Sequence, residues 1–388
     1  MVVESRKFVS VLASLILVLF LVMTICAPSP GLSPEPSPPV TPEPSPGAPI
    51  LTELGLVAES LAEKRLNVEK VYSGGTDEPA LCYLGSYAML AKFADSSINF
   101  TDVVANSGIG TSAFYIPQVN IMNDGSFLRS IGLAAINQGF DYYIVALKGA
   151  RITDDFLSPD FPKGAKQVLL LENEDEVFEL LRRLISSGIP VEVHLDCNFI
   201  KEALITYTPY WKTIFDFMGS KHADHYFAVT GYDQSSVYLN DPTEKATDKG
   251  KDIPVDISDF LEAWENGNHP SFELGAGIGP YWMVFLGKRG TAKSADELIS
   301  WNKDIATKAP GEIRKAADNP NIIPIIHCNN MYRARQEFGT FLKQNGYEEA
   351  GNMFIEASEL FRGLCQSQNQ QADLLEIADL QEQALTEW

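Results

Sequence analysis

Three residues that lie far apart in the sequence have side chains that could act together as a nucleophile, a base and an acid: Cys82, His225 and Asp241. Cys82 opens the segment 82–93, whose apolar residues recur at helical spacing, so a helix is predicted to begin at the cysteine. A thiol at a helix N-terminus faces the positive end of the helix dipole, and a neighbouring imidazolium would stabilise its thiolate form. A thiolate in such a place is a nucleophile.

His225 and Asp241 stand at the two outer ends of a predicted β-hairpin. Residues 226–230 and 237–239 are apolar or small and are separated by a polar break, which is typical of two strands joined by a turn. Antiparallel pairing brings the start of the first strand beside the end of the second, so the two side chains should meet. An imidazole next to a carboxylate is half of a catalytic triad, and Cys82 would complete it.

The elements around these residues are predicted from periodicity. Further strands are expected at 142–147, 167–171, 189–195 and 282–286. Helices are expected at 51–66, 125–138 and 175–186, and beyond residue 294 at 298–309, 332–344, 348–364 and 371–386. Helices segregated from a mainly antiparallel sheet predict an α+β domain, followed by a helical region.

The hairpin also resembles a known family. Residues 225–233 and 237–242 are similar to the papain-like peptidase domain that cleaves bacteriocin leaders, and to the related butirosin-biosynthesis BtrH N-terminal family. The likeness to the second family extends to the strand before the histidine, at 189–196, and to the helix after the acid, at 257–264. It covers about residues 70–365.

This resemblance implies a papain-like cysteine peptidase fold, with a cysteine-bearing helix in front of a sheet that carries the histidine and the acid. It makes Cys82 the nucleophile, His225 the base and Asp241 the residue that orients the base. It implies no cofactor.

Two positions depart from the leader peptidases. The residue after the cysteine, usually small, is Tyr83, and Thr76 stands where those enzymes carry a glutamine that helps bind the oxyanion. The oxyanion donors are therefore left open among the backbone N–H of Cys82, Ser73, Thr76 and the amides of residues 74–75.

A triad of this kind would form an acyl-thioester, and the second nucleophile decides the reaction. Water would make the protein a peptidase or amidase acting on a peptide or amide substrate. An amine would make it an acyltransferase, as the BtrH likeness implies for relatives that draw acyl groups from carrier proteins. A noncatalytic binding module on the same scaffold is a third possibility, because it needs the cleft and not the thiolate.

A metal site is the main competing chemistry at the hairpin. His222, Asp224 and His225 are close in sequence, and His194 and Asp196 belong to a neighbouring strand. On a strand, residues three apart point to opposite faces, and the resemblance already uses His225. No metal is expected, and we expect His194 to be a hydrogen-bonded core residue.

The N-terminus carries a targeting signal. Arg6 and Lys7 precede an apolar run, 8–26, that is long enough to span a membrane, so residues 1–26 are predicted to be a signal peptide or a membrane anchor. Cys26 could be lipidated or could be an ordinary cysteine of this run. Residues 27–49 are rich in proline and predict an extended linker.

The expected organisation is thus a signal or anchor at 1–26, a linker at 27–49, a papain-like domain at 50–290 and a helical domain at 291–388. The protein is expected outside the cytoplasm, secreted or held at the cell membrane by its N-terminal segment. Acyl carriers are not expected there, which favours hydrolysis.

Composition excludes one class of partner. The formal net charge is −21 and no basic patch is interleaved with aromatic residues, so nucleic acid is not an expected partner. The cysteines beyond residue 26 have neither metal-ligand spacing nor the density of a disulfide framework. Cys328 and Cys365 could pair or could be buried thiols. The oligomeric state is left open.

Overall fold

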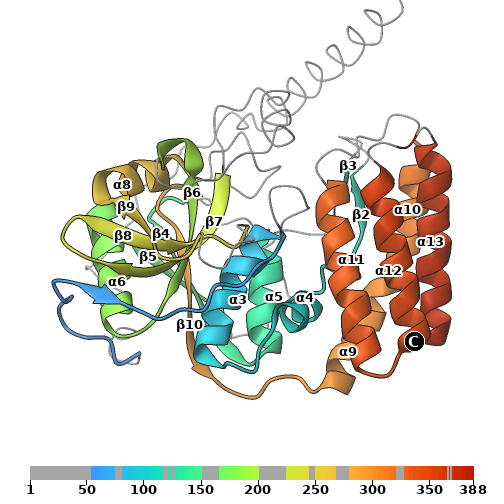
Figure 1. Cartoon of the computed structure of the whole chain (residues 1–388), viewed down its shortest axis with the longest axis horizontal. Coiled ribbons are helices and arrows are strands. Elements are labelled where there is room, and N and C mark those ends of the chain that lie inside the picture. The colour runs from blue at the N-terminus through green and yellow to red at the C-terminus, as the bar shows by residue number, and fades with distance from the viewer. Residues whose placement is uncertain are drawn as a thin grey trace, which may run out of the picture. The chain divides into compact units, whose positions relative to one another are not determined.

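The computed structural model of the protein describes residues 54–74, 81–116, 121–123, 127–150, 166–200, 224–243, 250–267, 279–319, 327–364, 367 and 369–388. The predicted signal or anchor and the proline-rich linker lie outside these residues. Within the described part of the chain, no helix is long and apolar enough to cross a membrane. Figure 1 shows the chain from blue at the N-terminus to red at the C-terminus.

A single eight-stranded sheet forms the centre of the fold. Its strands are β1 (Lys64–Arg65), β4 (Phe140–Leu147), β5 (Lys166–Leu171), β6 (Val191–Asp196), β7 (Asp224–Tyr232), β8 (Ser236–Asn240), β9 (Ile253–Asp256) and β10 (Met283–Arg289). The order is β5-β4-β10-β6-β7-β8-β9, and β1 pairs with β7. The pairs are antiparallel except for β4 and β5, which run parallel.

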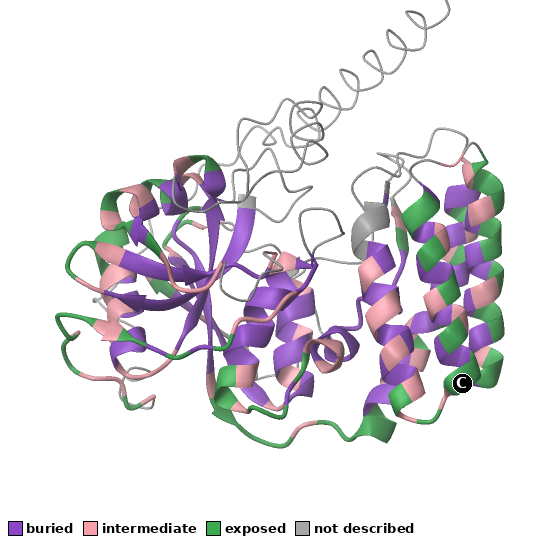
Figure 2. Cartoon of the chain, in the orientation of Figure 1, coloured by how far each residue is buried: buried purple, intermediate pink, exposed green. Residues whose placement is uncertain are grey.

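Helices cover both faces of this sheet. They are α3 (Cys82–Ala94), α4 (Phe100–Ser107), α5 (Phe127–Asn137), α6 (Glu174–Ser186) and α8 (Ile257–Asn266). Figure 1 shows α3 and α5 on one side of the sheet and α6 and α8 on the other. Since both faces are packed, β6 is buried at every position, and Figure 2 shows the strands mostly in purple. The α+β fold class is confirmed, as are the positions of most predicted strands and helices.

The predicted helix at 51–66 is wrong. The described residues 54–66 form turns, irregular backbone and the short strand β1. Leu66 donates its backbone N–H to the carbonyl of Thr230 at 2.8 Å, so the segment runs along β7. Its apolar spacing reflects burial of residues such as Leu66 and Val68 against the sheet, and tertiary contact overrides the helical pattern.

Five helices form the C-terminal part, which we call the helical region (residues 295–388). They are α9 (Ala295–Ala306), α10 (Ala309–Ala317), α11 (His327–Gln344), α12 (Glu348–Leu364) and α13 (Gln370–Glu387). The single helix predicted at 298–309 is instead two. The second begins at Ala309 with Pro310 in its first turn, where the missing N–H of proline costs no helical hydrogen bond.

A short hairpin, β2 (Phe114–Ile116) with β3 (Ile121–Asn123), joins the helical region to the sheet-bearing part. The Tyr115 backbone N–H donates to a Glu312 carboxylate oxygen of α10 at 3.2 Å, and Arg335 of α11 donates to the Ser112 carbonyl at 2.9 Å. The boundary at residue 290 stays a prediction, although residues of this hairpin pack on helices beyond it.

Candidate active site

Cys82 is the first residue of α3, as the sequence predicts. The helix buries every residue from Tyr83 to Ala91, whereas Cys82 itself is only partly buried. Leu81 precedes the helix as its N-cap and donates its backbone N–H to the Ser73 carbonyl at 3.2 Å. The first N–H groups of a helix have no intrahelical acceptor, so those at the cysteine face outward from the helix start.

Gly85, one turn further on, lets α3 lie against the chain that follows β8. A Cβ atom at this glycine would come within 2.5 Å of the Ser73 hydroxyl and 2.6 Å of the Pro242 Cβ. Ser73 also donates its backbone N–H to the Pro242 carbonyl at 2.9 Å. Because Pro242 directly follows Asp241, this close packing fixes the start of α3 relative to the carboxylate.

His225 and Asp241 meet as the hairpin predicts. His225 Nε2 lies 2.9 Å from Asp241 Oδ1, and both side chains are buried. Thr243 holds the same oxygen from the other side, with its backbone N–H at 2.8 Å and its hydroxyl at 2.7 Å. Burial raises the pKa of the Asp241 carboxyl, but the charge and hydrogen bond of His225 and the two bonds from Thr243 bring it below its usual value.

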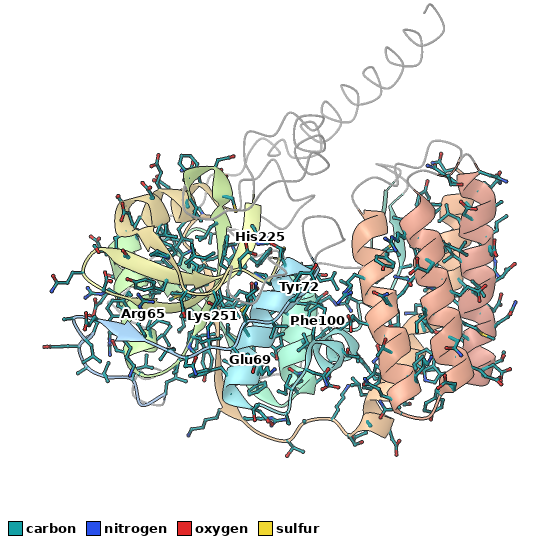
Figure 3. The ribbon with its side chains drawn as sticks, viewed as in Figure 1. Arg65, Glu69, Tyr72, Phe100, His225 and Lys251 are labelled. Carbon is teal, nitrogen blue, oxygen red and sulfur yellow. The ribbon has the colours of Figure 1, made fainter. Side chains whose placement is uncertain are left out.

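The structure brings Cys82 to the same imidazole. Its sulfur hydrogen-bonds with the His225 side chain, which therefore lies between the thiol and Asp241. Burial lowers the pKa of His225, but the charges of Asp241 and Cys82 and the hydrogen bonds to both raise it to about 10. The imidazole is therefore held as an imidazolium near neutral pH. Figure 3 labels His225 beside the start of α3.

The candidates for the oxyanion donor can now be narrowed. Ser73 is fully buried, and its hydroxyl as well as its N–H donate to the Pro242 carbonyl, so it is not available to a substrate. Thr76 and Gly75 lie outside the described residues. The backbone N–H groups of Cys82, at the start of α3, and of Gly74 are the described candidates that remain.

Two ionisable residues of β6 lie close to this site. His194 is buried between the rings of Tyr226 and Trp282, with centroid distances of 4.4 and 5.8 Å, and its Nδ1 has no hydrogen-bond partner. The expectation of a hydrogen-bonded histidine is wrong for this atom. Glu192, which sequence reasoning did not single out, is fully buried next to Cys82. The available signal was the alternation of Glu192, His194 and Asp196 with apolar residues along this strand.

The residues of the alternative metal site do not gather around one point in the described structure. His222 and the Asp224 side chain lie outside the described part of the structure. His225 contacts Cys82 and Asp241, and His194 lies between aromatic rings. Within the described residues, no three His, Cys, Asp or Glu side chains are grouped as metal ligands. Cys197 is a buried thiol. The Cys328 side chain and Cys365 lie outside what is described, so whether they pair stays open.

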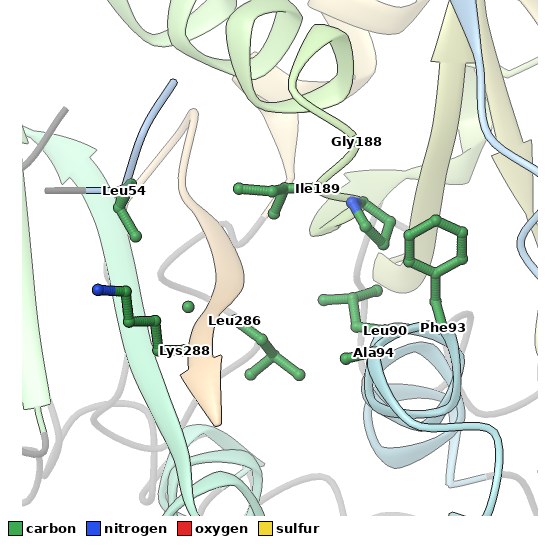
Figure 4. Close-up of a pocket in the computed structure, with 10 residues that line it drawn as sticks. Leu54, Leu90, Phe93, Ala94, Gly188, Ile189, Leu286 and Lys288 are labelled. Carbon is green, nitrogen blue, oxygen red and sulfur yellow. The ribbon is translucent and has the colours of Figure 1, made fainter. Parts of the chain in front are cut away.

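A cavity of about 260 Å³ lies at the other end of α3 (Figure 4). Apolar residues line most of it, including Leu90, Phe93 and Leu286, with Lys288 at the side. The cysteine is at the first residue of the helix and Leu90 is eight residues later, about 12 Å along the axis. The cavity is therefore separate from the triad.

Comparison with known proteins identifies the class. The profile of the Peptidase_C39-like family matches residues 68–271, more than half of the chain. The chain belongs to this family, and the resemblance to papain-like cysteine peptidases is confirmed. A crystal structure of a Bacillus anthracis protein described as a C39-like peptidase is similar to it, with 16% identity, a TM-score of 0.33, and coverage of 59% of this chain and 99% of that one. No curated protein matches the chain.

Proposed function

We propose that this papain-like peptidase cleaves a peptide or amide bond through a Cys82–His225–Asp241 triad. The observation that carries the proposal is the position of His225, hydrogen-bonded to Cys82 on one side and to Asp241 at 2.9 Å on the other. A buried imidazolium between a thiol and a carboxylate is the arrangement that cysteine nucleophiles require.

The mechanism follows from the position of each group. The Cys82 thiolate attacks the substrate carbonyl, and the Cys82 backbone N–H is placed to donate to the oxyanion. His225 then protonates the leaving amine, which departs and leaves an acyl-thioester. With its proton gone, His225 takes one from water, which attacks the thioester and releases the acid. Asp241, fixed by Thr243, holds the imidazole in the orientation that both steps need.

The test is acyl-enzyme formation on Cys82, measured by mass spectrometry with a panel of peptide esters. Asp241→Asn should lower labelling and turnover by about 10⁴-fold, as in the serine-protease case, because the amide favours the wrong imidazole tautomer. Thr243→Val is the graded comparison. It removes the hydroxyl bond to Asp241 and keeps the backbone N–H bond, so it should have a smaller effect. Equal labelling of wild type and Asp241→Asn would refute the triad. Absence of labelling in both would favour the binding module.

The acceptor of the acyl group is a separate part of the proposal. Hydrolysis predicts that the labelled protein decays at a rate independent of added amine. Decay that accelerates in proportion to an added primary amine, with the amide as product, would instead identify an acyltransferase.

We further propose that the protein acts outside the cytoplasm, because the apolar run at 8–26 and the proline-rich residues 27–49 have the composition of an export signal or anchor and a spacer. The full chain should appear in the membrane or exported fraction, and a chain that begins at Ile50 should remain in the cytoplasm. Full-length protein found free in the cytoplasm would contradict this.

A further inference from the structure

A layer of buried polar side chains lies between α3 and the sheet. It consists of Ser86 on α3, Tyr142 on β4, and Glu192 and His194 on β6. The two hydroxyl oxygens, both Glu192 carboxyl oxygens and His194 Nδ1 are buried without a hydrogen-bond partner. A buried polar group without a partner costs about 1–3 kcal/mol, so a fold does not gather several in one place without a reason.

Strand register places these residues on one face of the sheet. In β10, Val284 pairs with Glu192 on one side and with Ile144 on the other. Directly paired residues share a face, and so do alternate residues of one strand. Tyr142 and His194, each two residues from a member of this row, therefore lie on the same face as Glu192.

This is the face that α3 covers. His194 pairs with Tyr226 across β6 and β7, and the Tyr226 ring contacts that of Tyr83 on α3 at a centroid distance of 6.0 Å. Ser86 is one helical turn after Cys82, so the two residues share a side of the helix. The polar layer thus lies beneath the nucleophile.

Glu192 cannot carry a charge in this environment without a large cost. Its side chain is fully buried, and neither carboxyl oxygen accepts a hydrogen bond. Burial raises the pKa of its carboxyl well above the usual value, and the charge of Cys82 raises it further. Burial and the charge of His225 lower the pKa of His194 to about 3. Both β6 residues are therefore neutral beside the His225 imidazolium.

The other ionisable groups that face Glu192 do not supply a charge that would stabilise its carboxylate form. On α3 they are Cys82 and Tyr87, and on β4 Tyr142. Burial raises the pKa of both tyrosines well above the usual value, so they too are uncharged. The positive charge of Arg289 of β10 lowers the pKa of Tyr87, but burial and the charge of Glu192 outweigh it.

Granting the proposed triad, we propose that Glu192 is a positioning residue that acts as a buried neutral acid: its carboxyl proton, through the polar layer beneath α3, stabilises the Cys82 thiolate without adding a second negative charge. A neutral O–H donor favours a nearby anion, whereas a carboxylate at the same place would oppose it. Because the Glu192 oxygens have no hydrogen-bond partner, a bridging water would have to link Glu192 with Ser86 and Tyr142.

The proposal explains why an acid persists at this position. A buried ionisable group without partners is commonly less stable than an apolar residue of similar volume. Glu192→Leu should therefore raise the thermal unfolding midpoint. The same substitution should weaken the nucleophile, because the donor is lost. Gains in stability that cost activity are expected where a polar group is retained for function.

The experiment follows the rate of iodoacetamide alkylation of Cys82 against pH in the full chain, beside thermal unfolding. Glu192→Gln keeps a neutral donor and should react within about threefold of the wild-type rate at each pH. Glu192→Leu should need a higher pH for half-maximal rate, by about half to one unit, the value of one hydrogen bond. The matched control is Gln381→Leu, which removes a buried amide without partners from α13. It should change stability alone.

Three results would overturn the proposal. One is an unchanged pH profile in Glu192→Leu, and another is faster alkylation at low pH in Glu192→Gln, which would mean that Glu192 is charged in the native protein. The third result does not require that Glu192→Leu folds. Infrared difference spectra of wild type minus Glu192→Gln at neutral pH should contain the C=O band of a protonated carboxyl. A carboxylate band in its place would show that Glu192 is ionised. Equal alkylation of Cys82 and Cys197 in the wild type would instead refute the proposed function.

Discussion

The sheet-bearing part of the chain and the helical region bury polar side chains in different ways. In the helical region several such groups bond to backbone carbonyls. The Asn302 amide donates to Ala105 and Leu298 at 2.9 and 3.0 Å, the Ser358 hydroxyl donates to Ile355 at 2.5 Å, and the fully buried Arg335 donates to Ser112 at 2.9 Å. These bonds link helices with one another and with the neighbouring chain, and each is made to a backbone carbonyl rather than to another ionisable side chain.

Around α3 and the hairpin the buried polar groups are ionisable and depend on one another. His225 is held by Asp241 and Cys82. Burial, aided by the charges of Cys82 and His225, keeps Glu192 and His194 neutral. Such a network is expensive when any member is missing, because each charge is buried in a medium of low dielectric constant. The difference between the two regions indicates that polar burial serves packing in one and chemistry in the other.

Removing an aromatic anchor from the helical region should have the largest effect on stability. Phe338 is fully buried against Phe341, Phe354 and Trp388, with centroid distances of 5.1–6.0 Å. Phe338→Ala should lower the free energy of unfolding by about 3–5 kcal/mol in chemical denaturation. The Cys82 alkylation rate of the native protein should stay unchanged if this region serves packing alone.

The number of unfolding transitions also tests whether the helical region and the sheet-bearing part are independent. Tyr115 and Ser112 hydrogen-bond to α10 and α11, so unfolding of Phe338→Ala should remain a single transition by both fluorescence and alkylation. Two separated transitions would show that the helical region unfolds independently.

A smaller effect is expected from closing the gap between α3 and the Asp241 segment. Gly85→Ala places a Cβ within 2.6 Å of Ser73 and Pro242, so one of them must move. We expect a loss of about 1–3 kcal/mol, as for other overpacked sites, together with slower Cys82 alkylation.

The matched control is Gly363→Ala in α12, where a new Cβ would meet nothing within 4 Å. It should stabilise the helix by up to about 1 kcal/mol and leave alkylation unaffected. A Gly85→Ala protein with wild-type alkylation would show that the start of α3 is positioned by other contacts.

Much of this arrangement follows from local sequence patterns. The meeting of His225 with Asp241 is predictable because it depends only on the pairing of adjacent strands. Cys82 at a helix start is predictable from the periodicity that follows it. The bounds of α12 match the expected helix because its apolar face and its neighbouring turns are all local signals.

Other features depend on contacts between distant segments. Among the apolar residues at 54–66, Leu66 is buried beside β7 whereas Leu61 is exposed, and nothing local separates that pattern from a helix. β9 contains Pro254, and a proline normally argues against a strand. However, β9 lies at the edge of the sheet, where a missing N–H is tolerated. The neutral state of Glu192 depends on α3 and β4 together, so it cannot be predicted from the residues of β6 alone.

The smallest of these effects is a difference in pH dependence. Because His225 has its pKa raised from 6.5 to about 10, its protonated form contributes stability that is fully present below about pH 6.5 and is lost as the pH rises through 10. The Cys82 charge and hydrogen bond are part of that rise. Cys82→Ala should therefore lose less stability than wild type between pH 6.5 and 10, by about 1 kcal/mol in thermal or chemical unfolding.

Cys197→Ala is the control for this measurement, because Cys197 is a second free thiol, buried after the end of β6, and does not contribute to the His225 shift. Lysines and tyrosines elsewhere titrate equally in all three proteins, so only the differences between them count. Parallel curves for wild type and Cys82→Ala would mean that the thiol does not stabilise the imidazolium, and the ionised pair would then be absent from the resting protein. A narrowed alkaline loss in Cys82→Ala alone would locate the pH-dependent stability in the proposed triad. It would thus separate the coupled ionisable groups around α3 from the buried polar groups of the helical region that bond to backbone carbonyls.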